Sequence, residues 1–292
     1  MLDPVVAVDR LRAAFGGPAG RRTLHAKGRF YAGTFTASPE AAALGRAGHL
    51  TGGPVPVLVR WSNAGGNASV PDKAPDIRGM AVKFRLPDGT STDLLGQTAR
   101  RFPTDSPEDF VAMTEASRRP LLLPLFLLQH LRMVPAILDG LRSKAVSSPA
   151  SFTVPTYYPI HAYGWRDDSD RLHWVRYVIA PRSNEPLGTR FGGSDRLFDE
   201  MSARLAQGAV RCDVRLQVAG PGDDPHSAVS VWKAARELLA GTIEVTEELA
   251  DQEGDGPVVF DPTRVVDGIE LSDDPILRYR PSAYSESIRR RA

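Results

Sequence analysis

The last stretch of the chain brings a tyrosine together with several arginines. In RYRPSAYSESIRRRA, the arginines around Tyr284 are Arg278, Arg280, Arg289, Arg290 and Arg291. A phenol in water has a pKa of about 10, and a positive charge beside it favours the anionic form. The stretch therefore indicates either a solvated basic tail or a tyrosine whose chemistry requires neighbouring positive charge.

Three other blocks carry unusual combinations of reactive residues. His25 lies in RRTLHAKGRF, at the mouth of an expected strand, and VRWSNAGGNASVPDKAPDIRGMAVKF is followed closely by DLLGQ. The third block, FDPTRVVDGIELSDDPILRYRPS, leads into the tyrosine stretch. Each block alone has an ordinary explanation, since a lone histidine is usually structural and DIRG could be a turn with a salt bridge. Their meaning depends on their combination.

General catalytic and metal-binding motifs leave the function open. The chain has no HExxH, no CxxC pair, no Walker loop and no GxSxG. Its six histidines show no metal-ligand spacing, and the glycines of GPVPVLVRWSNAGGN do not form a phosphate-binding pattern.

The elements that must position these residues are mainly strands. Alternation of apolar and polar residues predicts strands at about 28–36, 55–62, 79–86, 92–96, 156–165, 171–180, 209–219 and 241–247. In GMAVKFRL, for example, Met80, Val82 and Phe84 point to one face and Lys83 to the other. Helical patterns cover 107–117, about 120–143, 194–207 and 272–291.

Two of the predicted helices have special features. The segment from Pro120 is the most apolar, but its three prolines and Arg132 make it a poor membrane span, so we expect a buried helix. A face near a lipid-like substrate is the weaker alternative. In the last helix, Ser272 or Asp274 can cap the first turn, and Pro281 predicts a kink or a restart.

Strands without regular βαβ alternation predict an α+β fold, with an antiparallel sheet or closed barrel and inserted helices. We expect a single domain over residues 1–292, with the barrel at about 25–250. The loop ADQEGDGP at 250–257 would separate it from a C-terminal segment at about 258–292.

Composition narrows the classes of function. The chain of 292 residues has 36 Lys+Arg against 35 Asp+Glu, so a nucleic-acid-binding protein is not expected. Its single cysteine, Cys212, excludes an internal disulfide, and its alternating surroundings predict a buried strand position. The first residues do not resemble a signal peptide, and we expect a cytoplasmic protein without a stable membrane span.

Taken together, the blocks resemble the haem catalase family. HAKG, VRxS…DxRGxAVKF, DLxG, FDP…GIE and RxxxY…RxR occur in the family's order, over about 22–110 and about 258–291. Because the chain is shorter than ordinary catalases, it looks like the small catalase-related peroxidase branch. The resemblance implies an eight-stranded catalase-like β-barrel with a C-terminal haem-ligating helix.

The resemblance also implies how haem b is held. Tyr284 would ligate the ferric iron as a tyrosinate, and Arg280, one helical turn earlier, would keep the phenol anionic. Arg22, Arg60 and Arg291 would pair with the haem propionates.

On the opposite side of the haem, His25 would be the acid–base residue and Ser62 would orient it. Gln97 occupies the position of the distal amide, and Phe102 and Phe110 match aromatic positions near the haem. Peroxide cleavage would then proceed through a ferryl intermediate, favoured by electron donation from tyrosinate.

Three departures from the family pattern bear on the activity. Gln97 replaces an asparagine, and Asn63 and Ala64 replace a threonine and a valine. The smaller Ala64 should leave room for bulky organic hydroperoxides, so we expect a peroxidase with weak or modest catalase activity. A non-catalytic haem carrier, or a haem-free barrel that binds an apolar ligand, are the alternatives. The organic electron donor, nicotinamide binding and any homo-oligomer stay open.

Overall fold

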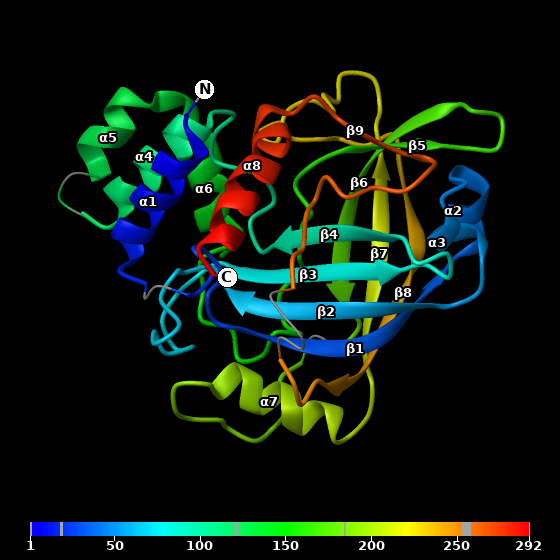
Figure 1. The fold of residues 1–292 in the computed structure, drawn as a ribbon, viewed down its shortest axis with the longest axis horizontal. Helices are drawn as coiled ribbons and strands as arrows, with labels where there is room; N and C mark the ends of the chain where they lie inside the picture. Colours follow the sequence, from blue (N-terminus) through cyan, green and yellow to red (C-terminus); the bar gives the residue numbers. More distant parts are fainter. Residues whose placement is uncertain are drawn as a thin grey trace.

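A computed structural model describes residues 2–17, 20–119, 121, 123–183, 185–252 and 258–291. In these residues one antiparallel sheet curls strongly around its own core, with strand order β4-β3-β2-β1-β8-β7-β6-β5-β9 (Figure 1). The strands are β1 (Gly28–Ala37), β2 (Val55–Asn63), β3 (Arg78–Arg85), β4 (Ser91–Gln97), β5 (Tyr163–Arg166), β6 (Leu172–Pro181), β7 (Val210–Val218), β8 (Arg236–Glu248) and β9 (Ile269–Leu271).

The prediction of eight strands in a closed barrel needs correction. Nine strands form the sheet in the described part of the chain, and β4 and β9 are its edges. Of the strand expected at 156–165, only the end forms a strand, β5. Pro155 and Pro159 lack the backbone N–H that a strand donates to its neighbour in a sheet. Before β5, isolated bridges join Tyr158 to Gln97 and Tyr157 to Ile179. The three residues of β9 are too few to show alternation in the sequence.

Alternation along the strands gives the first half of the sheet two different faces. Val57, Val59 and Trp61 of β2 point into the hydrophobic core inside the curl. Arg60 and Ser62, between and beyond them, point to the opposite face. The outer face of β2, β3 and β4 is thereby available to line a site.

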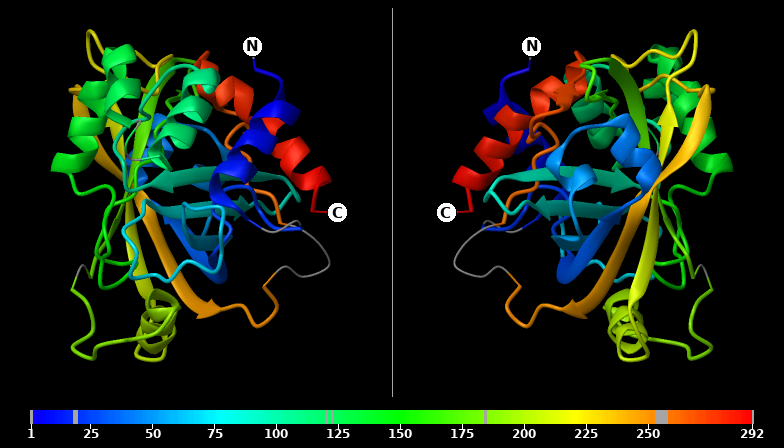
Figure 2. Two further views of the ribbon diagram at one scale, coloured as in Figure 1. Left: turned by 90° about the vertical axis from the view of Figure 1, so that its left-hand side faces the viewer. Right: turned by 90° about the vertical axis from the view of Figure 1, so that its right-hand side faces the viewer.

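Helices cover that outer face at one end of the sheet. Those nearest the site are α1 (Pro4–Phe15), α4 (Pro107–Ser117) and α8 (Pro275–Arg289), and α1 packs against both others (Figures 1 and 2). The other helical segments are α2 (Pro39–Leu44), α3 (Gly48–Thr51), α5 (Leu123–Gln129), the 3₁₀ turn η1 (Leu131–Met133), α6 (Val134–Arg142) and α7 (Arg196–Leu205).

The start of α1 carries a signal that the strand and helix predictions missed. The Asp3 side chain accepts hydrogen bonds from the backbone N–H groups of Val5 and Val6, and Pro4 opens the first turn.

The prediction of one buried helix at about 120–143 is wrong. The segment forms α5, η1 and α6, and α5 has no buried residue. Pro135 lies in the first turn of α6, where a backbone N–H would have no partner within the helix. The proline therefore favours the start of a new helix at this point. Pieces this short bury little surface each, and Leu128 and Leu131 stay 69% and 66% exposed.

The position of the C-terminal helix is predicted correctly, but the interruption expected at Pro281 is not found. Asp274 caps α8 by accepting a hydrogen bond from the backbone N–H of Ile276, and the helix runs through Pro281 without ending or restarting. Its ends are anchored by that cap and by a 3.0 Å hydrogen bond between Ser287 and Thr23.

The structure also describes the single cysteine and the length of the helices. Cys212 is fully buried on β7, and burial raises the pKa of its thiol to about 12, as expected of a structural cysteine. In the described ranges no helix is long and apolar enough to cross a membrane, and no cluster of three potential metal-ligating side chains occurs. Most of the loop expected at 250–257 lies outside the described residues.

Candidate active site

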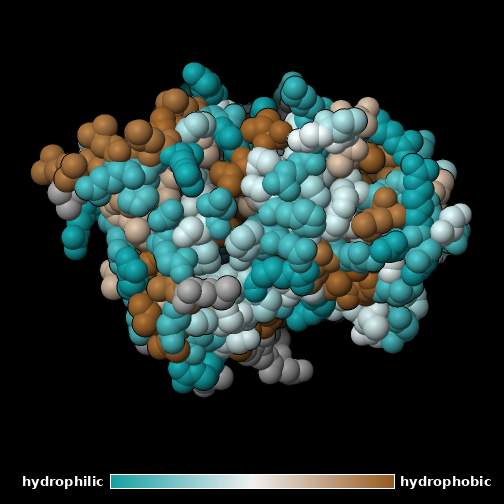
Figure 3. Space-filling view, turned by 90° about the horizontal axis from the view of Figure 1, so that it is seen from above, coloured by the Kyte–Doolittle hydropathy of each residue, from teal (hydrophilic) through white to brown (hydrophobic). Residues whose placement is uncertain are grey.

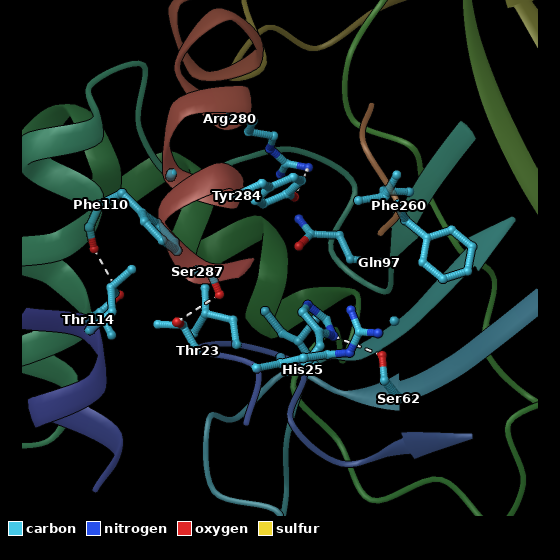
Figure 4. Close-up of a pocket in the computed structure, with 18 of the residues that line it drawn as sticks. Thr23, His25, Ser62, Gln97, Phe110, Thr114, Phe260, Arg280, Tyr284 and Ser287 are labelled. Carbon is cyan, nitrogen blue, oxygen red and sulfur yellow. Dashed lines mark hydrogen bonds between the residues drawn. The ribbon is translucent and has the colours of Figure 1, made fainter. Parts of the chain in front are cut away.

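A cavity of about 480 Å³ lies between the outer face of the sheet and helices α1, α4 and α8. The ten residues that the family resemblance assigned to the haem site all line it, although they come from positions 22 to 291: Arg22, His25, Arg60, Ser62, Gln97, Phe102, Phe110, Arg280, Tyr284 and Arg291. Figure 4 shows His25, Gln97 and Tyr284 around this space. The chain therefore brings the separate sequence blocks together in one place.

Strand register explains why the sheet contributes these residues. Ser62, Gly79 and Gln97 are direct partners across β2, β3 and β4. The next lining row, two residues along, contains Arg60, Ala81 and Leu95. Because side chains two apart share a face, a shift of one residue in any strand would remove its members from the cavity.

His25 is held in an unusual conformation just before β1. Its φ is 54°, in the left-handed region that a residue with a Cβ rarely adopts. Its backbone N–H donates to the Ala64 carbonyl at 2.9 Å, and Arg60 donates to the His25 carbonyl at 3.0 Å. These two bonds keep the backbone in place and aim the ring toward the cavity.

The ring of His25 is oriented by Ser62 and kept neutral. Nδ1 lies 2.9 Å from the Ser62 hydroxyl, which leaves Nε2 to exchange a proton with a molecule in the cavity. Burial lowers the pKa of His25 to about 3, helped by the positive charges of Arg60, Arg280 and Arg22. A neutral imidazole at ordinary pH can accept a proton.

Tyr284 and Arg280 meet on α8. An Arg280 Nη1 hydrogen bond to the Tyr284 hydroxyl spans 3.4 Å, as the four-residue spacing predicts. The guanidinium of Arg280 also lies 5.9 Å from the ring centre of Phe102. Pro281 does not prevent this contact.

The three arginines predicted to bind carboxylates are positioned by neighbouring groups. Arg22 donates to the Val258 carbonyl at 2.8 Å, and Arg22 and Arg60 both lie over the Phe30 ring. Arg60 is 5% exposed. Arg291 reaches the same cavity from the end of α8.

Phe102 and Phe110 form one aromatic wall. Their ring centres are 4.7 Å apart with an interplanar angle of 31°. Phe110 belongs to α4, whose first turn is capped by Ser106. Phe102 precedes α4 and is hydrogen-bonded through its backbone N–H to the Ala228 carbonyl.

The two other departures from the family pattern behave differently. Ala64 lines the cavity, as expected. Asn63 points away from it and joins a buried polar network, donating to Asp72 at 2.8 Å and accepting from Arg78 at 2.5 Å. Asn63 is therefore a structural residue, and DIRG is not a turn, because its Arg78 and Gly79 begin β3.

Two glycines that sequence reasoning passed over make room for the site. A Cβ on Gly79 would lie 2.7 Å from the His25 ring, and a Cβ on Gly28 would lie 2.6 Å from the Arg60 guanidinium. Glycine within an expected strand is the signal for such a close approach. The apolar face of α1, from Ala7 to Phe15, also lines the cavity without having been predicted.

Comparison with known proteins decides the family. The sequence model of the catalase family, described as catalase, matches residues 17–125. A catalase-related peroxidase from Mycolicibacterium paratuberculosis is 43% identical over 297 residues, covering 99% of this chain and 95% of the relative. This chain belongs to the catalase family. A second catalase-related peroxidase, from Synechococcus elongatus, is 27% identical to this chain. The match covers 99% of this chain and 88% of that relative.

Both relatives place the chain in the small catalase-related peroxidase branch of the catalase family. Catalase A from Saccharomyces cerevisiae has the same fold, with a TM-score of 0.80 and 20% identity. The match covers 97% of this chain but 64% of the yeast protein. The predicted catalase-like fold is thereby confirmed at the level of the curled antiparallel sheet.

Haem is the cofactor expected in the catalase family, and the cavity suits it. Its volume lies within the range of roughly 300–1,000 Å³ usual for small-molecule sites. Among the described lining residues there are five arginines and a single carboxylate, Asp76, on otherwise mainly apolar walls. A flat apolar ring system with two carboxylates matches this combination.

Proposed function

We propose that this protein is a haem-dependent peroxidase that reduces hydrogen peroxide or organic hydroperoxides, with weak or modest catalase activity. The observation that carries the proposal is that one cavity is lined by a candidate acid–base residue and by a candidate iron ligand, which come from different elements of the fold. His25, neutral and oriented by Ser62, comes from the sheet side, and Tyr284, paired with Arg280, comes from α8. A haem peroxidase needs a protein ligand for its iron and a group that transfers the protons of the peroxide, and these residues could supply both.

The residues of α8 would hold haem b through its iron. Tyr284 would be the ligand in its anionic form, and the Arg280 guanidinium stabilises that anion through the bond it already makes. Arg22, Arg60 and Arg291 would receive the propionates. Haem, when bound, supplies the electrons that cleave the peroxide O–O bond.

His25 would perform the proton transfers. Its Nε2 would take the proton from the O–H oxygen of a hydroperoxide and return it to the other oxygen, which leaves as an alcohol, or as water when the substrate is hydrogen peroxide. Over the full cycle one hydroperoxide, two electrons and two protons give one alcohol and one water. An organic donor, such as a phenol, supplies the two electrons and is itself oxidised.

The preference for peroxidase over catalase chemistry rests on two lining residues. Gln97 carries its amide one methylene further than asparagine would, and Ala64 fills less space than valine would. A displaced donor lowers the rate of a reaction that depends on close positioning, and dismutation of hydrogen peroxide is the reaction we expect to lose most. The extra room favours bulky hydroperoxides.

An absorption spectrum of the purified protein before and after addition of peroxide tests the cofactor. A Soret band with a ferric high-spin spectrum is expected, and a colourless protein that takes up no added haemin would refute haem binding. His25→Ala then tests catalysis, because it should abolish peroxidase turnover while haem stays bound. Unchanged turnover would instead favour the haem carrier.

A cytoplasmic location is a further part of the proposal. It is supported by the single, fully buried cysteine. Fractionation of cells that produce the full chain would test it.

A further inference from the structure

One surface of the molecule combines exposed leucines with exposed positive charge. It lies on segment 117–146, which contains α5, η1 and α6, and we call it the leucine–arginine face. Its exposed leucines are Leu121, Leu125, Leu128, Leu131, Leu138 and Leu141, and Val146 at its end is exposed as well. Figure 3 shows hydrophobic side chains gathered at this end of the molecule, where α5 lies in Figure 1.

The exposed charges on this face are all positive. Its exposed cations are Arg118, Arg119, Arg132, Arg142 and Lys144. In the described part of the segment after α4, the one carboxylate is Asp139, half-buried and 3.8 Å from the guanidinium of Arg101. Since the whole chain is nearly neutral, with a formal charge of +1, this concentration is local.

The lining of the cavity reaches the two ends of this segment. Among the described residues that line it, only Ser117, Arg118 and Val146 are exposed. These three residues are the two ends of segment 117–146. The leucine–arginine face is therefore continuous along the chain with part of the cavity lining.

We propose that the leucine–arginine face docks on an anionic phospholipid bilayer and that the cavity receives hydroperoxides from the lipid phase. Short amphipathic helices with leucines and basic residues lie in the plane of a membrane interface, held by apolar burial and by attraction to anionic headgroups. No helix among the described residues is long enough to span the bilayer, so the contact is peripheral.

A second copy of this chain fits the face less well. A two-fold dimer sets the same patch of both copies against itself, so the five cations of each copy would be brought close to those of the other. Like charges facing each other oppose such a contact. An anionic bilayer neutralises the same charges.

This inference rests on the proposed function for its substrate, but its docking step can be tested separately. The full chain, loaded with haem, is mixed with vesicles of equimolar phosphatidylglycerol and phosphatidylcholine or of phosphatidylcholine alone, and the bound fraction is measured by flotation. Binding is expected on the anionic vesicles, and raised salt should weaken it because salt screens the attraction.

Two variants of the face probe its two contributions. In the cation variant, glutamine replaces four exposed basic residues of the face: Arg119, Arg132, Arg142 and Lys144. Its matched control removes four exposed cations elsewhere, namely Arg190, Arg211, Arg215 and Lys233. Each basic residue near an anionic surface contributes about fivefold to binding, so the cation variant should bind at least ~10-fold more weakly than its control.

The leucine variant replaces with glutamine three side chains that are 65–69% exposed, Leu128, Leu131 and Leu141. Its control is Leu239→Gln, at an exposed residue of strand β8. The leucine variant should also lose vesicle binding by ~10-fold or more, whereas the control should bind like the wild type.

Several outcomes would overturn the inference. These are no binding of the wild type to anionic vesicles at low salt, equal binding of both variants and controls, or a dimer in solution that the leucine variant converts to a monomer. Turnover of water-soluble tert-butyl hydroperoxide, measured without vesicles, separates the two proposals. If it is absent while vesicle binding holds, the proposed function fails and the docking surface stands.

Discussion

Replacing Gly79 by alanine should disable the proposed base without touching the proposed iron ligand. The added Cβ would lie 2.7 Å from Cε1 and Nδ1 of His25 and 2.9 Å from the Ser62 hydroxyl oxygen. Gly79 lies in β3, which is hydrogen-bonded on both sides by β2 and β4, so its backbone cannot move away. The side chains on the cavity side must move instead.

The size of the effect follows from these distances. To reach ordinary contact at 3.4 Å, the His25 ring must withdraw by about 0.7 Å, and its 2.9 Å bond to Ser62 would lengthen or break. A displacement near 1 Å of a reacting group typically lowers a rate on the order of 100-fold. That loss corresponds to about 2.7 kcal/mol of transition-state stabilisation.

The assay is peroxide turnover of haem-loaded protein, with the Soret band recorded for each variant. Gly79→Ala should keep its haem and lose about 100-fold in kcat/KM. Gly53→Ala, where the added Cβ meets nothing within 4 Å, is the control for a general effect of alanine. Ser62→Ala removes the hydrogen bond without the steric push, and should lose less.

Wild-type turnover of haem-loaded Gly79→Ala would refute the reasoning, because it would mean that the position of His25 does not limit the reaction. If Gly79→Ala fails to fold, Ser62→Ala decides the question. A Ser62→Ala enzyme with an unaltered rate would then argue against orientation of the His25 ring by this hydroxyl.

Three further predictions concern other parts of the site and the core. Gln97→Asn should raise catalase activity relative to peroxidase activity, and an unchanged ratio of the two would argue against Gln97 as the distal amide. Deletion of residues 285–292 removes Arg291 and the Ser287 contact and should weaken haem binding in a haemin titration, whereas removal of a solvated tail would leave the titration unchanged. His49 is 4% exposed, and burial lowers its pKa to about 4, so the unfolded chain takes up a proton below its ordinary pKa of about 6.5 while the folded chain does not. As the pH falls from about 6.5 to 4, the free energy of unfolding should therefore drop by about 1.4 kcal/mol per pH unit from this residue, and urea titrations of His49→Phe should show a shallower dependence.

Local patterns in the sequence were sufficient for most of the elements. Period-two alternation placed β1, β2 and β3 within a residue or two of their ends, the helical pattern at 107–117 matched α4, and Asp274 was one of the two caps expected for α8. The failures have local causes as well. Prolines shortened the strand ahead of β5 and divided the apolar segment after α4, and periodicity alone does not report these interruptions.

The sequence by itself also determined the contact between Arg280 and Tyr284, because a helix brings residues four apart onto one face. The order of its motifs indicated the catalase family, which the comparisons confirm. These conclusions depend on near neighbours in the chain or on motifs read directly from it.

Only the tertiary structure decided which side chains lie together in the cavity and which lie elsewhere. Strand register aligned Ser62, Gly79 and Gln97, turned Asn63 away from the cavity and left space at Gly79 for the His25 ring. The tertiary structure also leaves the leucines of α5 and α6 exposed to solvent, although the apolar composition of that segment had indicated burial. Burial, pKa and exposure depend on residues far apart in the chain, so they appear only when the sheet has curled and α8 has closed over it.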